Sequence, residues 1–143
     1  MSEGAGYTRS LMEVDGMNIL AEKISDSELE VMRVLWAAKD ALPVSEIRKA
    51  IQQKTGWESS TAKTLLYRLQ NKGVVSQIKR DVYYYSPLIS EEEYNEYTTQ
   101  LFIDRLYKGS AKNLIASLVS TKKLTPDDIM ELQNMLRSGK KDE

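Results

Sequence analysis

The chain is predicted to be mostly α-helical with one small β-hairpin, with an N-terminal winged helix-turn-helix and a C-terminal three-helix dimerisation domain. Three observations lead to this fold class. Apolar residues recur at helical spacing across residues 25–73. Two short β-prone runs then occupy residues 74–86, and helical spacing resumes after Pro87. This order of elements is the one that a winged helix followed by a helical domain requires.

Residues 25–36 are predicted to form the first helix. Ser25 or Ser27 is the candidate cap, because a serine hydroxyl can accept a hydrogen bond from the first turn. The early acids Asp26, Glu28 and Glu30 favour the positive end of the helix dipole. The apolar anchors expected in the core are Leu29, Met32, Leu35 and Trp36.

Residues 42–51 are predicted to form the second helix, the partner helix of a helix-turn-helix. Ser45 is the expected N-cap, since it follows Pro43. Gly56 is expected to end the helix in the left-handed conformation that glycine adopts without strain. The inward stripe consists of Val44, Ile47, Ala50 and Ile51.

Residues 57–73 are the most informative segment and are predicted to contain the DNA-recognition helix. Leu65, Leu66 and Leu69 have the spacing of a core-facing stripe. The opposite surface carries short hydroxyls, which let a backbone approach phosphates, and cations that reach phosphates or guanine edges. The alternative is an ordinary amphipathic helix with a solvated polar face. The residues predicted to contact DNA are Ser60, Thr61, Lys63, Thr64 and Arg68.

Residues 74–79 and 82–86 are predicted to form a hairpin, the wing. Lys79 and Arg80 lie near its tip, where we expect them to contact phosphates; the alternative is that they are merely solvated. The three tyrosines at residues 83–85 are expected to pack the sheet against the helices rather than to stack on bases.

Composition excludes several classes of function. The chain has 143 residues, no cysteine and no histidine. Disulfides, cysteine- or histidine-dependent nucleophilic catalysis and nearly all structural zinc sites are therefore excluded. No paired acids stand out in an apolar setting, so we expect no enzyme, no cofactor and no metal site. Without an apolar run of membrane-spanning length or a signal peptide, a cytoplasmic location without membrane association is expected.

The distribution of charge is more informative than its total. The net charge of the chain is −1. Residues 42–88, however, carry eight cations and three acids, a net charge of +5, whereas residues 1–41 and 89–143 have net charges of −4 and −2. A cationic middle between acidic ends is typical of a localised DNA-binding surface.

The C-terminal third is predicted to contain three helices. The first begins at a capping box, Ser90 with Glu93, and ends near Gly109. The second covers residues 110–121, and the third opens at Thr125 with Pro126 in its first turn. So many apolar residues in so small a unit favour a homodimer; the alternative is a monomeric subdomain packed on the winged helix. The predicted dimer residues are Leu101, Phe102, Leu106, Leu114, Ile115, Leu118, Val119, Ile129, Leu132 and Leu136.

These assignments divide the chain into four parts. Residues 1–23 are expected to be a disordered or poorly ordered extension, in which Met12 or Met17 is an alternative start. Residues 24–88 are the predicted winged helix and residues 89–138 the predicted dimerisation domain. Residues 139–143 are a charged tail.

Several segments resemble the BlaI/MecI/CopY family of bacterial transcriptional repressors. The most specific are WxxxTxKTLLxRLxxKG at residues 57–73 and FIDRLYKGS at residues 102–110. The resemblance implies a homodimer that binds a two-fold promoter operator in double-stranded DNA, blocks transcription and is relieved by an inducing signal. It also implies that residues 60, 61, 63, 64 and 68 contact DNA. Ser60 stands where β-lactam-responsive members often have a lysine, so one phosphate contact is lost.

The resemblance distinguishes two inducer branches. Copper-responsive members carry a Cys-x-Cys pattern near the C-terminus, and this chain has no cysteine. β-Lactam-responsive members are cut at an Asn-Phe bond by a regulatory protease. Phe102 matches the phenylalanine, but Leu101 replaces the asparagine, so cleavage between Leu101 and Phe102 is a hypothesis. The chain is therefore more similar to the BlaI/MecI penicillinase-repressor branch.

Two alternative functions are consistent with parts of this pattern. A winged helix can be a protein-docking module without sequence-specific DNA binding, although the retained cations disfavour it. A small-molecule sensor with a pocket between the domains is the other, but no converging set of polar residues marks such a pocket.

Overall fold

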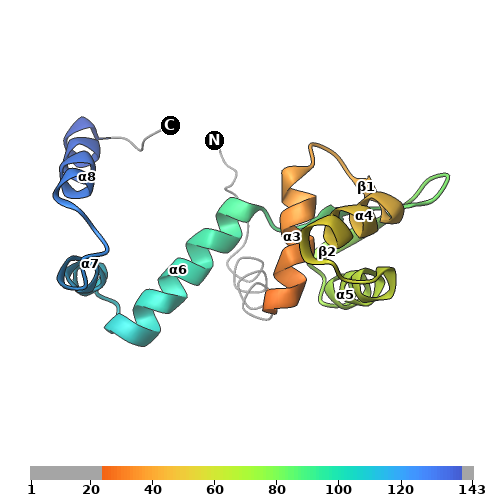
Figure 1. The fold of residues 1–143 in the computed structure, drawn as a ribbon, viewed down its shortest axis with the longest axis horizontal. Helices are drawn as coiled ribbons and strands as arrows, with labels where there is room; N and C mark the ends of the chain where they lie inside the picture. The colour runs from red at the N-terminus through yellow and green to blue at the C-terminus, as the bar shows by residue number, and fades with distance from the viewer. Residues whose placement is uncertain (1–23, 140–143) are drawn as a thin grey trace, which may run out of the picture. The chain divides into compact units, whose positions relative to one another are not determined.

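A computed structural model describes residues 24–139, and Figure 1 shows their fold. The predicted N-terminal extension and residues 140–143 of the predicted tail lie outside the described residues. The chain divides into two compact units, one ending at Thr98 and the other beginning at Thr99. The division falls inside a helix, so the predicted boundary at residue 88 stays a prediction.

Helix α3, Asp26–Ala37, begins at a capping box. The Glu28 N–H donates to Ser25 Oγ at 3.1 Å, and the Ser25 N–H donates to Glu28 Oε1 at 2.9 Å. Ser25, not Ser27, is therefore the cap. Of the predicted anchors, Met32 and Leu35 are buried, whereas Leu29 and Trp36 are half-buried and pack against the core.

Trp36 has the structural role that the sequence suggested. Its Nε1–H donates to the Ile89 carbonyl oxygen at 2.9 Å, and its ring centroid lies 5.5 Å from that of Tyr94. Burial raises the pKa of the Tyr94 phenol. Trp36 thus attaches the start of the first C-terminal helix, which begins at Glu91, to α3.

Helix α4, Val44–Thr55, begins one residue before the predicted cap, so the assignment of Ser45 as N-cap was wrong. The cap position is held by Pro43, which forms no side-chain cap bond. The cause is a short strand that the sequence reading missed, β1, Leu42–Pro43. It pairs antiparallel with the wing through Leu42 opposite Tyr85 and Pro43 opposite Tyr84.

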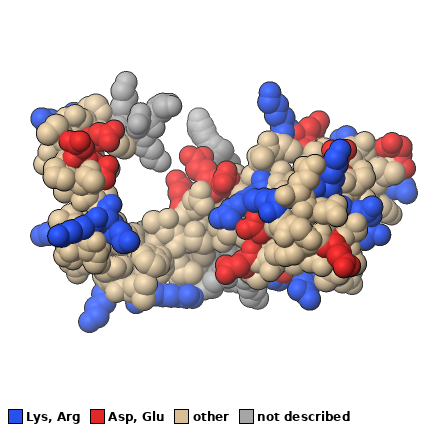
Figure 2. Space-filling view, viewed as in Figure 1, with Lys and Arg blue, Asp and Glu red and all other residues tan. Residues whose placement is uncertain are grey.

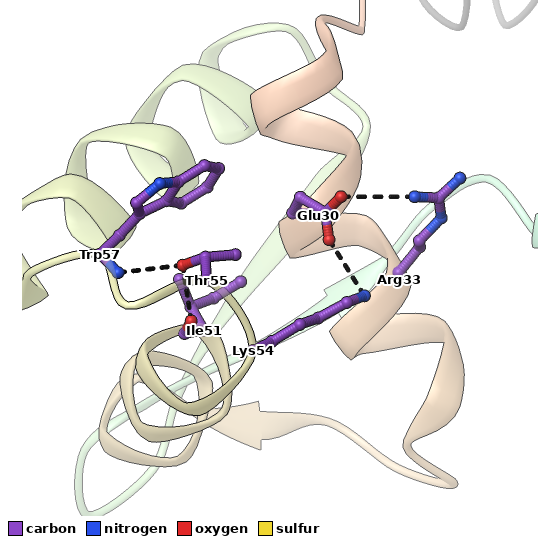
Figure 3. A network of polar contacts seen from close by, with 6 residues as sticks. All are labelled: Glu30, Arg33, Ile51, Lys54, Thr55 and Trp57. Atoms are coloured by element: carbon purple, nitrogen blue, oxygen red, sulfur yellow. Dashed lines mark hydrogen bonds and ion pairs between the residues drawn. The ribbon is translucent and has the colours of Figure 1, made fainter.

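The turn after α4 follows the prediction. Gly56 has a φ of +78°, and its N–H donates to the Gln52 carbonyl oxygen at 2.8 Å. The Thr55 hydroxyl donates to the Ile51 carbonyl oxygen at 2.7 Å and accepts from the Trp57 N–H at 3.0 Å (Figure 3). Both bonds hold the turn between the two helices in one conformation.

A small ion-pair network connects α3 with α4 (Figure 3). Glu30 lies 3.0 Å from Lys54 Nζ and 3.4 Å from Arg33 Nη1. The cations are half-exposed, so each pair contributes at most about 1 kcal/mol. The network fixes orientation more than it adds stability.

Helix α5, Ser59–Asn71, occupies the predicted recognition segment. Its stripe of Leu65, Leu66 and Leu69 is buried as predicted, and Ala62 joins it. Helices α3, α4 and α5 pack against one another and against the small sheet. The buried core comprises Ile24, Val31, Met32, Leu35, Ile47, Ile51, Ala62, Leu65, Leu66, Leu69, Val74, Val75, Tyr85 and Ile89.

The wing is a hairpin of β2, Val75–Lys79, and β3, Tyr83–Pro87, as predicted. The register runs from Val75 opposite Pro87 to Lys79 opposite Tyr83, and the sheet order is β1-β3-β2. Tyr85 is buried, Tyr84 is half-buried and Tyr83 is 44% exposed. The expectation that all three tyrosines pack on the helices was therefore wrong for Tyr83. It lies on the same side of β3 as Tyr85 but two residues nearer the hairpin tip, outside the core.

The C-terminal helices are α6, Glu91–Tyr107, α7, Ala111–Ser120, and α8, Pro126–Ser138. The predicted capping box of α6 forms: the Glu93 N–H donates to Ser90 Oγ and the Ser90 N–H donates to Glu93 Oε1, both at 3.0 Å. Thr125 and Asp128 form another at α8, with proline in the first turn. These local signals define the helix starts.

The C-terminal helices bury little within one chain. Within the described residues, neither α7 nor α8 contains a buried side chain, and Ile103 is the buried residue of α6. All ten predicted dimer residues are half-buried or exposed, and Leu136 is 83% exposed. None of the helices between residues 24 and 139 has the length and apolar character needed to cross a membrane.

Candidate nucleic-acid interface

The surface of α5 carries the five helix side chains that the sequence predicted for DNA contact, and the other two, Lys79 and Arg80, belong to the wing. Ser60, Thr61, Lys63, Thr64 and Arg68 are all exposed, while the leucine stripe anchors the opposite side of the helix. Thr64 Oγ1 donates to the Ser60 carbonyl oxygen at 3.0 Å, which leaves the lone pairs of the hydroxyl directed outward.

The N-terminus of α5 suits the approach of an anion. The cap residue, Glu58, forms no side-chain cap bond, and the first turn of α5 holds no acidic residue. The N–H groups of Thr61 and Ala62 donate to the Glu58 carbonyl oxygen, so the N–H groups of Ser59 and Ser60 are the ones that remain for an anion at this end. Such a helix end attracts phosphate through its N–H groups and its dipole.

The C-terminal end of α5 is held by a buried acid. Lys72 Nζ lies 2.6 Å from Glu28 Oε1, and Glu28 is 2% exposed. Burial alone raises the pKa of the Glu28 carboxyl, but hydrogen bonds from Lys72 and Ser25 and the Lys72 charge outweigh it and leave the pKa below its usual value. Glu28 therefore joins the α3 cap to the end of the recognition helix.

The wing holds its two cations over aromatic rings. Lys79 Nζ lies 4.6 Å from the Tyr83 ring centroid, and Arg80 Cζ lies 4.7 Å from that of Tyr84. Cation–π contacts of this kind contribute about 0.5–1 kcal/mol at exposed sites. They limit the directions that two long side chains sample and keep both charges near the tip.

A groove of about 520 Å³ separates α5 from the wing. Lys63 and Tyr67 line it from α5, and Lys79 and Tyr83 line it from the hairpin. Asp81 is the one acid among its described lining residues. The groove thus brings a predicted helix cation and a predicted wing cation to the same recess, and it does not include Arg68.

Three residues that line this groove form a chain of hydrogen bonds that sequence reasoning missed. Gln70 Nε2 donates to Gln77 Oε1 at 3.2 Å, and Gln77 Nε2 donates to Tyr85 Oη at 2.9 Å. All three residues line the groove. We call them the amide relay, since they connect α5 to β2 and β3. No local pattern pairs residues seven and eight apart across two elements, so the relay could be found only from the fold.

Tyr67 is another residue that sequence reasoning missed. It is 65% exposed on α5, although its size would allow it to bury a large apolar area. A signal was available: residue 67 follows Lys63 and Thr64 at the four- and three-residue spacings that share a helix face.

Basic side chains are exposed around α5 and the hairpin, with acidic ones between them (Figure 2). The region from residue 42 to residue 88 has a net charge of +5. Among residues 24–139, no group of three or more acids could hold a metal ion.

Comparisons with known proteins place this chain in a family. The family model described as "Penicillinase repressor" matches residues 24–138. A penicillinase repressor of Bacillus licheniformis is 32% identical over 119 residues, covering 82% of this chain and 92% of the relative. The methicillin resistance regulatory protein MecI of Staphylococcus aureus (strain N315) is 34% identical over 115 residues, covering 80% and 93%.

A solved structure adds a third likeness, to the monomeric form of Bacillus licheniformis BlaI in complex with the blaP half-operator. It is 36% identical in sequence, with a TM-score of 0.45, and the match covers 50% of this chain and 87% of that one. The family model covers nearly all the described residues, and both relatives agree with it in name and extent. The chain belongs to the penicillinase repressor family of DNA-binding transcriptional repressors.

Proposed function

We propose that this repressor acts as a homodimer on a two-fold symmetric operator in double-stranded DNA. Helix α5 enters the major groove, and the wing contacts the backbone beside it. The observation that carries this proposal is the exposure of a hydroxyl- and cation-bearing surface on α5, held by a buried leucine stripe. Two recognition helices would lie about one DNA turn apart, ~34 Å.

The roles of the contact residues follow from their chemistry. Ser60, Thr61 and Thr64 are short donors that bind phosphates or base edges, and Lys63 supplies a point charge. Arg68 can form two parallel hydrogen bonds to a guanine edge or contact a phosphate. Lys79 and Arg80 bind phosphates from the wing.

Dimerisation is supported by the apolar surface of the C-terminal helices. Phe102 and Leu106 on α6, Ile115 and Val119 on α7, and Leu132 on α8 are each more than 40% exposed. Exposed apolar side chains in such number mark an interaction surface rather than a solvated one. A second copy of this chain would cover them with the same set of residues, as a two-fold interface requires.

We place the repressor in the cytoplasm, because that is where its DNA operator lies. We assign it no enzymatic activity. A regulatory protease is a further proposed partner. The bond between Leu101 and Phe102 lies inside α6, whose residues Phe102 and Tyr107 have ring centroids 5.9 Å apart. Proteases cleave extended chain, so cutting there requires local unfolding of the helix. Mass spectrometry of the protein from induced cells would show a fragment ending at Leu101.

The test of operator binding is selection of bound fragments from the source genome at moderate salt. The control is the double variant Lys63→Ala/Arg68→Ala. We expect the parent chain alone to recover one or a few two-fold symmetric sites, and its affinity to fall steeply with salt. Equal recovery of unrelated fragments by both proteins, or recovery of none, would contradict operator recognition and favour a protein-docking module.

A further inference from the structure

Tyr67 is the one large side chain on α5 whose exposure the proposed contacts leave unexplained. It is 65% exposed, and among the described residues its hydroxyl has no hydrogen-bond partner. An aromatic ring in water forgoes the stabilisation that burial provides, so a ring held out on a helix surface suits an interaction with a partner.

The position of Tyr67 restricts what that partner is. Tyr67 lines the groove between α5 and the wing, with Tyr83 on the opposite wall. Lys63 lies on the helix side and Lys79 on the wing side, and Lys79 is held over the Tyr83 ring at 4.6 Å. The three residues of the amide relay also line the groove. Two apolar walls with a cation on each side fit an anionic chain that has apolar parts.

A DNA strand has this composition. Its phosphates are charged, and the carbon edges of its deoxyriboses are apolar. With α5 in the major groove and the wing on the neighbouring side, the strand that borders the groove has to pass between them. The groove between α5 and the wing is the space available for it.

We propose that Tyr67 is a DNA-backbone contact, whose ring packs on a deoxyribose and whose hydroxyl donates to a phosphate of the strand held between α5 and the wing. This rests on the proposed function and adds a residue to it. Lys63 and Lys79 neutralise phosphates on either side of the same nucleotides. Because the contact is to the backbone, it contributes to affinity on every sequence equally.

The experiment measures the dissociation constants of the full chain, Tyr67→Ala and Tyr67→Phe for the selected operator and for an unrelated duplex of equal length, over a series of salt concentrations. We expect Tyr67→Ala to weaken both complexes by a similar factor, about tenfold. Tyr67→Phe keeps the ring and should lose less. The salt dependence of all three should be the same, because tyrosine is neutral and displaces no counterion.

Leu88→Ala is the matched control. Leu88 is 52% exposed in the same unit but does not line the groove, so its removal should leave both affinities unchanged. The proposal is overturned if Tyr67→Ala binds both duplexes like the parent, or if it loses affinity for the operator alone, which would indicate a base contact.

Folding and operator binding are checked separately from the proposal. The helical circular dichroism of each variant reports folding, and Tyr67→Phe supplies the answer if Tyr67→Ala does not fold. If the parent and Leu88→Ala also fail to bind either duplex, the proposed function fails as well. If the parent binds DNA and both Tyr67→Phe and Tyr67→Ala bind it as tightly as the parent does, only the proposed backbone contact of Tyr67 fails.

Discussion

Glu28 shows how one buried side chain connects separate parts of the winged helix. Its carboxylate accepts from the Ser25 N–H at the start of α3 and from Lys72 Nζ just after α5. A buried charge costs free energy unless such partners satisfy it, and here both are in place. The orientation of the recognition helix therefore depends on an acid outside the interface.

Glu28→Gln is expected to lower the free energy of unfolding at neutral pH by about 1.5–3 kcal/mol, because it removes a charge-assisted hydrogen bond while keeping a side chain that can complete the capping box. The folded-state pKa of Glu28 lies below its ordinary value of 4.5. Its contribution is thus present above that value and is lost as the pH falls through the folded pKa.

Urea unfolding at several pH values between about 7 and 3 measures this difference. The parent should lose stability on acidification more steeply than Glu28→Gln. Parallel pH profiles for the two proteins would contradict the assignment.

Asp81 opposes the charge of the groove it lines. It stands at the wing tip near Lys79, in the recess that we assign to a DNA strand. Asp81→Asn is expected to tighten binding up to about fivefold at low salt, because exposed charge interactions are worth about 0.2–1 kcal/mol. The gain should shrink as salt is raised. Titration of labelled duplex measures it; Asp40→Asn, an exposed acid on the α3–β1 loop, is the control.

At the scale of elements, the wing is held by contacts that a hairpin alone cannot make. Strand β1 adds a third strand beside β3, and the amide relay connects α5 with both strands of the wing. An isolated two-stranded hairpin is marginally stable in water. These contacts hold the helix that carries Lys63 and the hairpin that carries Lys79 in one arrangement.

Gln77→Ala breaks both bonds of the relay and is expected to weaken DNA binding about threefold to tenfold while leaving the helix content unchanged, since the wing would sample more positions before binding. Binding assays with circular dichroism separate these effects. Gln53→Ala, an exposed glutamine on α4, is the control. An unchanged affinity in Gln77→Ala would show that the wing needs no such positioning.

For the whole molecule, the C-terminal helices do not bury enough to be stable as a free unit. Helices α6, α7 and α8 make few contacts with one another, and α7 and α8 have no buried residue within the described chain. Their starts are specified by local caps, but their apolar sides lack a core. In the proposed homodimer a partner copy would supply the missing surface, and a homodimer is the assembly that a two-fold operator needs.

Leu106→Glu is therefore expected to shift the chain from dimer to monomer at micromolar concentration, because a charge replaces an apolar side chain that is 62% exposed in one copy. Operator affinity should fall strongly while binding to a half-site changes little. Sedimentation equilibrium measures the first effect. Thr99→Glu, an exposed polar position on α6, should remain dimeric; a dimeric Leu106→Glu variant would exclude Leu106 from the interface.

Much of this protein could be predicted from its sequence because the signals are local. Helix α5, the wing strands, the left-handed Gly56 and the capping boxes at Ser25 and Ser90 all depend on residues within a few positions of each other. The cations and hydroxyls of α5 were likewise predictable from residue type and helical spacing, and the winged helix and the repressor family were confirmed.

What could not be predicted depends on residues far apart in the chain. Ser45 has the chemistry of a cap, yet pairing of Leu42 and Pro43 with β3 moves the start of α4. Tyr83 resembles its neighbours in sequence, but the hairpin pairs it with Lys79 next to the tip, where the core no longer covers it. Glu28 meets Lys72, and Gln77 meets Gln70 and Tyr85, because packing of the helices on the sheet brings them together. Tertiary packing, rather than local propensity, shapes the groove beside α5.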